Sequence, residues 1–441
     1  MWGYYVGLAL RSSARSKALT TLVIALLAFG VAACMVSYAV FRATTSDPLP
    51  SKSSRLYMPQ VDNFGPSSSA GEPPTNLNYT DAVALWQAGK ASRQALVFPT
   101  TWELTSGERM DSSMSLGGDA VTADFFPMFE VPFRFGSGWA PQDDTRHGSV
   151  AVISHRLNDR LFGGSNSVGR EIQLDGKMFR VSGVLEPWNP KPRFFDVATL
   201  GPLSAFDDAG DVYVPFSRAI DLKKAPQYDY CPASATDAGV TDWEKYLRSE
   251  CVWINAWVEL PTPTSAQGYR DFLRNYSEAQ RQAGRFTWGP NVRLRNVTEA
   301  ITILHVTPKA SSLSMVVSAS FLLIVLVNVV GLMLARFMRR APEIGIRRAL
   351  GASRGAIYRQ FLTEGATIGC VGGLVGVGLT LLGLWGAGGL FEPKIARLVN
   401  VDASLIALTV LLAIAATVIS ALYPTWRAAQ TQPAWQIKIN G

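Results

Sequence analysis

Four apolar segments of about 20 residues constrain the fold of this chain more than any other feature. They are residues 18–41, 313–337, 367–390 and 404–423. A helix of about 20 apolar residues is long enough to cross a bilayer, and none of the four segments has a charged residue at its centre. The sequence therefore predicts four transmembrane helices. Residues 42–312 lie between the first two and are long enough to form a large folded domain.

Charged residues are distributed unevenly around these segments. Residues 1–17, 336–366 and 424–441 carry 12 Lys and Arg against two Asp and Glu, whereas residues 43–312 carry 26 against 30. Cytoplasmic flanks of membrane helices are enriched in Lys and Arg. We therefore expect both termini and the loop 338–366 in the cytoplasm and the domain 42–312 outside. The basic pI near 9.2 reflects this topology, and nucleic-acid binding is not expected.

The N-terminal region predicts a membrane anchor preceded by an interfacial segment. Residues 18–41 exceed the apolar length of a signal peptide, and no A-x-A cleavage site follows them. Residues 1–17 contain Trp2, Tyr4 and Tyr5, and aromatic rings favour the headgroup level. An interfacial helix along the inner leaflet is one interpretation, and a frayed chain end is the other.

The domain 42–312 predicts an α+β fold in two parts. Residues 43–75 are rich in Ser, Pro and Thr and favour an extended linker. An α/β part, which the family resemblance described below implies to be porter-like, is expected at about 75–117 and 252–300. It would include a helix near 78–90 capped by Thr80 or Asp81, a helix at 265–282 and strands that include 286–288. A β-rich insert is expected at about 118–216. Within it, the alternating residues around Asp175-Gly176 predict a hairpin with a type I′ turn.

Residues 341–353 form a short basic segment between two of the membrane segments. Pro342 suits the first turn of a helix, Gly351 can end it, and Ser353 can cap the next one. Glu343 and Arg347 are four residues apart and can pair on such a helix. This helix could enter a groove of a cytoplasmic partner, or it could be a membrane-surface loop held by anionic headgroups.

Small residues predict where two membrane helices pack closely. Gly369 and Gly373 are spaced four apart, as are Gly372 and Gly376. This small-x-x-x-small spacing lets helix backbones approach closely. Packing against 404–423 is the simpler interpretation, and contact with a second subunit is the alternative.

The cysteines and histidines indicate no catalytic or metal centre. Cys231 and Cys251 lie in the external domain, where a disulfide closing the loop 231–251 and two unpaired thiols are both compatible with the sequence. A disulfide across a loop of this size would stabilise the domain by roughly 3 kcal/mol. The three histidines are far apart, and no Ser-His-Asp or Cys-His arrangement stands out, so we expect neither a metal site nor an enzyme.

Several motifs together resemble the MacB/FtsX-like family of ABC transporter permeases. The motifs, in chain order, are Val121-Thr-Ala-Asp-Phe-Phe126, Val150-Ala-Val-Ile-Ser154, Leu161-Phe-Gly-Gly164, Val168-Gly-Arg-Glu-Ile172, Glu343-Ile-Gly-Ile-Arg-Arg-Ala-Leu-Gly-Ala-Ser353 and Pro424-Thr-Trp-Arg-Ala-Ala429. The resemblance covers nearly the whole chain. It implies one membrane helix, a MacB-type periplasmic core domain and three further helices in the bacterial inner membrane.

The resemblance also implies a function and a coupling site. The residues expected to contact an ATPase are Glu343, Ile344, Gly345, Arg347, Arg348, Ala349, Leu350, Gly351, Ala352 and Ser353. No G-x-x-x-x-G-K-[ST] loop occurs in the sequence, so we expect no cofactor in this chain and ATP with Mg²⁺ bound by a separate ABC ATPase.

The partners implied are a second permease, as a homodimer or heterodimer, and in some members a periplasmic adaptor and an outer-membrane channel. The expected function is ATP-driven export by a MacB-like transporter. The alternatives are an FtsX-like mechanotransducer that activates a periplasmic enzyme and a lipoprotein-releasing permease resembling LolC/LolE.

Overall fold

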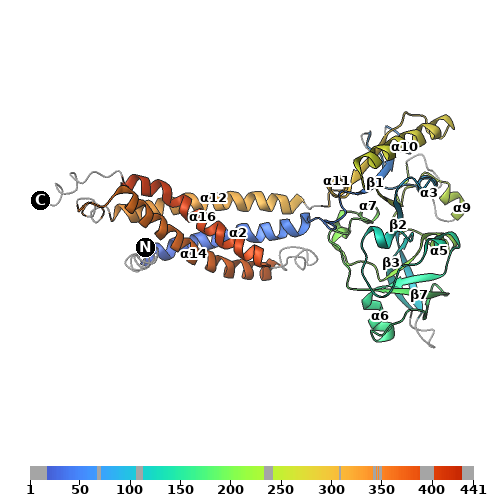
Figure 1. Cartoon of the computed structure of the whole chain (residues 1–441), viewed down its shortest axis with the longest axis horizontal. Coiled ribbons are helices and arrows are strands. Elements are labelled where there is room, and N and C mark those ends of the chain that lie inside the picture. The colour runs from blue at the N-terminus through green and yellow to red at the C-terminus, as the bar shows by residue number, and fades with distance from the viewer. Residues whose placement is uncertain are drawn as a thin grey trace. The chain divides into compact units, whose positions relative to one another are not determined.

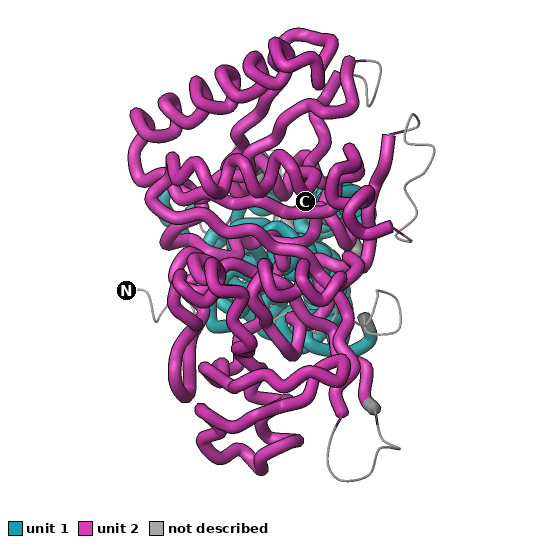
Figure 2. Tube along the Cα trace, turned by 90° about the vertical axis from the view of Figure 1, so that its right-hand side faces the viewer, with its two compact units in different colours: residues 1–45, 308–441 teal, residues 46–307 magenta. Residues whose placement is uncertain are grey.

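The computed structural model describes residues 17–66, 71–105, 113–232, 242–306, 309–340, 344, 346, 350–387 and 402–429. The chain divides into two compact units, coloured separately in Figure 2. Residues 1–45 and 308–441 form the first unit, and residues 46–307 form the second. Apart from Lys17, the predicted interfacial segment 1–17 lies outside the described residues.

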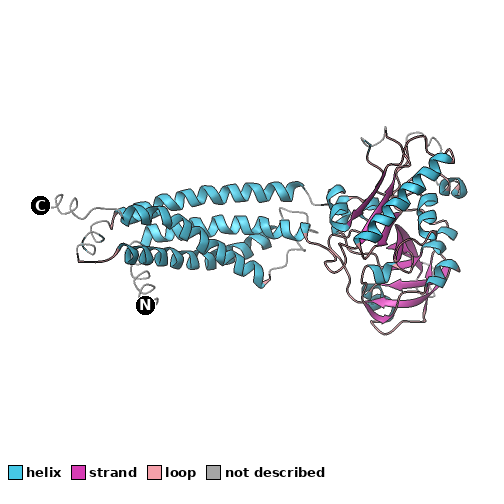
Figure 3. Cartoon of the chain, turned by 45° about the horizontal axis from the view of Figure 1, so that its top comes forward, coloured by secondary structure: helices cyan, strands magenta, loops and turns pink. Residues whose placement is uncertain are grey.

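The first unit is a bundle of four long helices, seen side by side in Figure 3. They are α2 (Lys17–Thr45), α12 (Lys309–Met338), α14 (Arg354–Ala387) and α16 (Ala403–Ala429). Each contains a stretch long and apolar enough to cross a membrane. Helix α14 begins at Arg354, before the predicted apolar segment 367–390. Residues 354–366 of the predicted cytoplasmic segment are therefore part of this helix.

Glycines on α14 allow the helices of the bundle to pack closely. A Cβ on Gly369 would lie 2.8 Å from the Cα of Ile414, and one on Gly373 would lie 3.0 Å from the Cα of Val410. Both contacts are with α16, as the small-residue spacing predicts. Gly372 faces the other way, toward Leu27 of α2. The glycine stripe is therefore used inside the chain.

The second unit is built on one ten-stranded sheet, whose strands are the arrows in Figure 1. Its order is β10-β1-β9-β2-β3-β8-β5-β7-β4, and β6 pairs with β2 and β7. The strands are β1 (Leu56–Val61), β2 (Arg93–Thr105), β3 (Ser113–Val121), β4 (Phe133–Gly136), β5 (Val150–Ile153), β6 (Glu171–Leu174), β7 (Lys177–Leu185), β8 (Val212–Pro215), β9 (Asn255–Glu259) and β10 (Val292–Asn296).

Short helices cover both faces of this sheet and create two cores. Along β2, Leu96 and Phe98 belong to one core while Ala95 and Val97 belong to the other, because successive side chains of a strand point to opposite faces. The first core includes α3 (Tyr79–Gln87), α6 (His155–Phe162), α8 (Phe216–Asp221), α9 (Trp243–Leu247) and α10 (Pro263–Gln282). The second includes α4 (Phe125–Met128), α11 (Val297–Ile303) and the aromatic residues of the segment 186–206.

The predicted hairpin and the predicted α+β class are confirmed. β6 and β7 pair antiparallel across Asp175 and Gly176, whose φ angles of 47° and 73° fit a type I′ turn. The two predicted parts of the domain share the sheet. β2 pairs with β9 on one side and with β3 on the other, so strands of both parts are continuous through β2 and β3.

Three local predictions are wrong. The segment 43–75 is no linker, because it contains β1, which pairs with β10 and β9 in the sheet. Residues 286–288 form no strand; Phe286 is instead buried in the first core beside Trp288. The N-cap of α3 is Asn78 and not Thr80 or Asp81. The Asn78 side chain accepts a hydrogen bond from the backbone N–H of Asp81.

Candidate functional site

One end of the bundle holds the segment that connects α12 with α14. Its anchor is Ile344, which is 5% exposed and shares a core with Val23 of α2, Met333 of α12, Phe361 of α14 and Ala421 of α16. Its backbone N–H donates to the carbonyl oxygen of Arg340 at 3.1 Å. Burial of one such side chain contributes about 1.5–3 kcal/mol. Among the described residues of the segment, Ile344 is the buried apolar side chain that packs against all four helices.

Two apolar side chains of the same segment point away from the bundle. Ile346 is 63% exposed and Leu350 is 83% exposed. The N–H of Leu350 donates to the carbonyl oxygen of Ile346 at 3.0 Å, so the two residues lie one helical turn apart. Exposed apolar residues on one face of a short helix are suited to a hydrophobic groove of a partner.

The segment ends with a sharp reversal into α14. Gly351 has a φ of +95°, in the left-handed region that favours glycine at the end of a helix. Ser353 then caps α14, because its Oγ accepts from the N–H of Ala356 at 3.2 Å. Both features follow the spacing that the sequence predicts. Ala352 lies half-buried between them.

Five of the predicted coupling residues lie outside the described residues. These are Glu343, Gly345, Arg347, Arg348 and Ala349, and with them the expected Glu343–Arg347 pair. The structure places the other five, Ile344, Leu350, Gly351, Ala352 and Ser353, at the same end of the bundle. The role of all ten in contact with an ATPase stays a prediction.

A buried ionic cluster lies beside this segment, and the sequence reasoning did not identify it. The carboxylate of Glu364 in α14 is 2.5 Å from Nη2 of Arg336 and 3.3 Å from Nη1 of Arg340. The side chains of Glu364 and Arg336 are only 2% and 3% exposed. Glu364 is one of two acidic residues in the basic stretch 336–366, and that isolation was the available signal. The cluster fixes the end of α12 against the start of α14.

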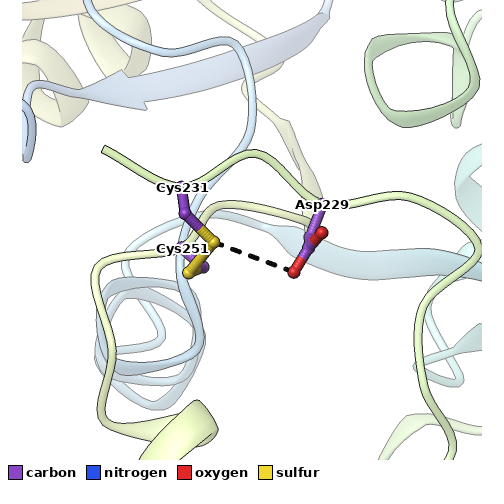
Figure 4. A group of neighbouring side chains, drawn as sticks. All are labelled: Asp229, Cys231 and Cys251. Atoms are coloured by element: carbon purple, nitrogen blue, oxygen red, sulfur yellow. Dashed lines mark hydrogen bonds between the residues drawn. A yellow bond between two sulfur atoms is a disulfide. The ribbon is translucent and has the colours of Figure 1, made fainter. Parts of the chain in front are cut away.

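The cysteine loop lies in the other unit and is closed by a disulfide. Cys231 and Cys251 are bonded, with their Cα atoms 4.1 Å apart, and Asp229 lies beside them (Figure 4). One oxygen of Asp229 is 3.9 Å from Sγ of Cys231 and accepts from the hydroxyl of Tyr246 at 3.0 Å. Burial, together with the Asp229 carboxylate, raises the pKa of Tyr246, so its hydroxyl stays a donor.

This group has the composition of a metal site without its chemistry. Asp229, Cys231 and Cys251 are the three described residues whose donor atoms converge within 4.8 Å. Cysteine binds a metal ion as the thiolate, and both sulfur atoms are consumed by the disulfide, so Asp229 is the one metal-binding group left among the three. The cluster is therefore a covalent support for the segment before β9.

Two family models match this chain, and together they cover residues of both compact units. The MacB-like periplasmic core domain matches residues 20–275, and the FtsX-like permease C-terminal region matches residues 315–433. The pyoverdine export ATP-binding/permease protein PvdT of Pseudomonas aeruginosa is 29% identical over 274 residues, which are 62% of this chain and 35% of PvdT. The macrolide export ATP-binding/permease protein MacB of Syntrophobacter fumaroxidans is 26% identical over 343 residues, 71% of this chain and 46% of that protein.

The chain thus spans between a third and a half of the length of these curated relatives. Among solved structures, the periplasmic region of MacB from Actinobacillus actinomycetemcomitans aligns at 12% identity with a TM-score of 0.36, covering 58% of this chain and 94% of that one. The assignment depends on the sequence matches, which cover the domain between α2 and α12 and the three helices that follow it. The chain therefore belongs to the MacB-like family of ABC transporter permeases.

Proposed function

We propose that this chain is the permease subunit of a MacB-like exporter in a bacterial inner membrane. A separate ABC ATPase would bind ATP and Mg²⁺ and contact the segment between α12 and α14 from the cytoplasm. The chain itself would contribute no catalytic group. A second permease, identical or related, would complete the complex, and an adaptor with an outer-membrane channel would carry substrate onward.

The observation that carries this proposal is the arrangement of three apolar residues. Ile344 is buried among all four helices, while Ile346 and Leu350 are exposed on the same short segment. A partner that binds the exposed pair would therefore push on a residue packed into the bundle. The ion cluster around Glu364 would keep α12 and α14 moving as one body. In the chain, α2 comes directly before the external domain and α12 directly after it. Motion of the bundle would therefore reach the domain through both connections.

The names of the curated relatives favour export over the other two functions considered, activation of a periplasmic enzyme and release of lipoproteins. PvdT and MacB are both named as export proteins and as ATP-binding/permease proteins. These names support an ATPase as the partner and export as the outcome. Activation of a periplasmic hydrolase and release of lipoproteins have no comparable support here.

The exposed pair gives a direct test of the coupling site. We expect Leu350→Asp to remove the ATPase from the purified complex and to abolish ATP-dependent export, because a charged side chain cannot enter an apolar groove without a large desolvation cost. Leu350→Met is the matched control, since it keeps an apolar side chain of similar size. The tagged chain would be purified from native membranes and its associated proteins identified by mass spectrometry.

The test separates a coupling segment from a membrane-surface loop. If Leu350→Asp reaches the membrane in normal amount and still retains an ATPase and export, the coupling proposal is wrong. If no ATPase accompanies the wild-type chain under mild solubilisation, the partner proposal also fails.

A further inference from the structure

A polar pocket of about 350 Å³ lies in the external domain, where β3 and β8 run side by side. This volume is near the lower end of the range of about 300–1,000 Å³ for small-molecule sites. The segment between β7 and β8 folds over this face of the sheet and supplies much of the lining. The lining includes Gly118, Asp119, Arg193, Asp207, Asp208 and Asp211. No role was predicted for this pocket.

Asp119 is the residue that makes the pocket unusual. Its side chain lines the pocket although the residue is only 2% exposed. Among the residues that the structure describes, no hydrogen bond or ion pair within 4.0 Å reaches its carboxylate. An ionised carboxylate has about four acceptor positions, and a buried polar group without a partner is costly. The Asp119 carboxylate therefore has unused hydrogen-bond acceptor positions on the side that faces the pocket.

The buried cation that lines the pocket, Arg193, is held by partners other than Asp119. Arg193 donates through Nε to Asp196 at 2.9 Å and places Nη2 2.8 Å from the other Asp196 oxygen. Its Nη1 donates to the backbone carbonyl of Asp208 at 2.7 Å. Nε and Nη1 of Arg193 thus have hydrogen-bond acceptors other than Asp119, and Nη2 forms an ion pair with Asp196.

A second buried polar group lies next to Asp119 in the sheet. Tyr213 of β8 is the register partner of Asp119 in β3, so both side chains are on the same face. The hydroxyl of Tyr213 is fully buried and has no hydrogen-bond partner among the described residues. Tyr213 does not line the pocket, so Asp119 is the one of these two unsatisfied groups that a ligand in the pocket would reach.

The charge of the pocket selects the kind of ligand. Four carboxylates line it, those of Asp119, Asp207, Asp208 and Asp211, against the guanidinium groups of Arg156 and Arg193. Arg156 is committed to Asp211, at 2.9 Å. Asp208 also lies 3.6 Å from Arg156 and 3.9 Å from Lys191. With Lys191 counted, four carboxylates face three cations, so the pocket is net acidic by one charge when Asp119 is ionised. A metal ion is a poor fit, because the described carboxylates of the pocket do not converge in a set of three, as the atoms near Cys231 do.

We propose that this pocket binds an organic cation, whose ammonium or guanidinium N–H groups donate to the carboxylate of Asp119. Such a cation supplies charge and several donors in one small group, which a buried carboxylate with free acceptor positions requires. The cation could be a free small molecule or a Lys or Arg side chain of a peptide. The proposal does not depend on ATPase coupling, so its failure would leave the proposed function untouched.

The test is calorimetric titration of the full-length chain in lipid nanodiscs at pH 8. The probes are butylguanidinium, its neutral isostere butylurea, and the tripeptide acetyl-Ala-Arg-Ala-amide. We expect butylguanidinium to bind at least about tenfold more tightly than butylurea, since a charge-assisted hydrogen bond is lost in the neutral compound. Binding of the tripeptide would show that a peptide side chain can be the source, and binding of the free cation alone would restrict the site to small molecules.

Two variants make the assignment specific. We expect Asp119→Asn to weaken butylguanidinium binding by at least about tenfold. Asp271→Asn removes the same charge from the exposed face of α10 and should leave binding unchanged. Thermal unfolding of each variant checks that the fold is intact. Equal affinity for the cation and its neutral isostere, retention of binding in Asp119→Asn, or binding of Ca²⁺ with no binding of butylguanidinium would each overturn the proposal.

Discussion

At the scale of single residues, the external domain contains two kinds of buried charge. Arg285 represents the compensated kind, with Asp81 and Glu250 as its partners. Asp119 represents the uncompensated kind, since its charge is opposed by Asp196 and only partly offset by Arg193. Compensated groups hold the fold together, whereas an uncompensated group lowers stability when it is ionised. The two kinds predict opposite effects of substitution.

Burial raises the pKa of Asp119 to about 8, with a further rise from the Asp196 charge and an opposing effect of Arg193. Because this folded-state pKa lies above the unfolded value near 3.9, the folded state binds the proton more tightly, and its stability falls as pH rises through about 8. The charged and titratable groups around it are Arg193, Asp196, Tyr213, Arg156, Lys191, Asp207, Asp208 and Asp211. We expect Asp119→Asn to stabilise the domain at pH 8, by on the order of a few kcal/mol, and to flatten its pH profile.

Denaturant unfolding of the full chain between pH 6 and pH 9, followed by tryptophan fluorescence, checks this expectation. Asp271→Asn serves again as the exposed control. Parallel pH profiles for the wild type and Asp119→Asn would show that Asp119 is not the titrating group.

Arg285 ties three parts of the external domain together. Its guanidinium contacts Asp81 of α3 at 2.5 Å and Glu250 of the cysteine loop at 2.8 Å, and Asp81 is 1% exposed. The hydroxyl of Tyr276 in α10 also donates to Asp81, at 2.6 Å. We expect Arg285→Met to destabilise the domain by roughly 3–5 kcal/mol, because it leaves a buried carboxylate without its counter-charge.

The matched control for Arg285 is four residues away. Arg281 pairs with Glu278 on the solvent-exposed face of α10, so Arg281→Met should leave the unfolding midpoint essentially unchanged. Denaturant midpoints of the two variants, measured side by side, give the comparison. Similar midpoints for both would mean that the Arg285 network adds nothing to stability.

At the scale of elements, the close packing of α14 predicts opposite effects for two glycines of one helix. Ala at Gly369 would overlap the side chain of Thr417 and approach the backbone of α16, whereas nothing lies within 4 Å of the corresponding position at Gly378. We expect Gly369→Ala to destabilise the bundle by about 1–3 kcal/mol through overpacking. Gly378→Ala should be neutral or slightly stabilising, because alanine has the higher helix propensity. Thermal inactivation of the detergent-solubilised chain, read by size-exclusion chromatography, compares them; equal loss would argue against this packing.

The elements that the sequence predicted well are those with an uninterrupted local signal. The four apolar helices and the hairpin at Asp175-Gly176 needed only length, hydropathy and turn chemistry. β1 was missed because Ser- and Pro-rich residues surround it and Pro59 interrupts it, so its strand character comes from pairing with β10 and β9. Non-local pairing of this kind leaves little trace in a short window of sequence.

In the candidate coupling segment, the helix end and the next cap could be predicted from the sequence, whereas the buried and exposed side chains could not. Gly351 and Ser353 act through local backbone rules, which the spacing revealed. The contrast between buried Ile344 and exposed Leu350 depends on how the segment packs against the four helices. The sequence does not reveal this contrast, because Ile344, Ile346 and Leu350 are all large aliphatic residues. The pairing of Glu364 with Arg336 likewise depends on how the bundle brings these two side chains of α12 and α14 together.

At the scale of the whole molecule, the two compact units divide the charge between them. The basic excess belongs to the ends and connections of the helix bundle, and the external domain is slightly acidic. This asymmetry, with the family assignment, predicts that the segment at Leu350 and the hairpin at Met178 are on opposite sides of the membrane. Both side chains are exposed, at 83% and 50%, so each can report the side on which it lies.

Cysteine labelling tests this topology. The free cysteines Cys34 and Cys370 would first be changed to Ala, and the disulfide between Cys231 and Cys251 would be left in place. In that background we expect Met178→Cys to react with a membrane-impermeant maleimide in intact spheroplasts and Leu350→Cys to react only in inverted vesicles. The reason is that a bilayer excludes the charged reagent, while the basic flanks predict a cytoplasmic loop. Labelling of both positions from the same side would require an even number of crossings between them, and the inserted-domain arrangement would have to be abandoned.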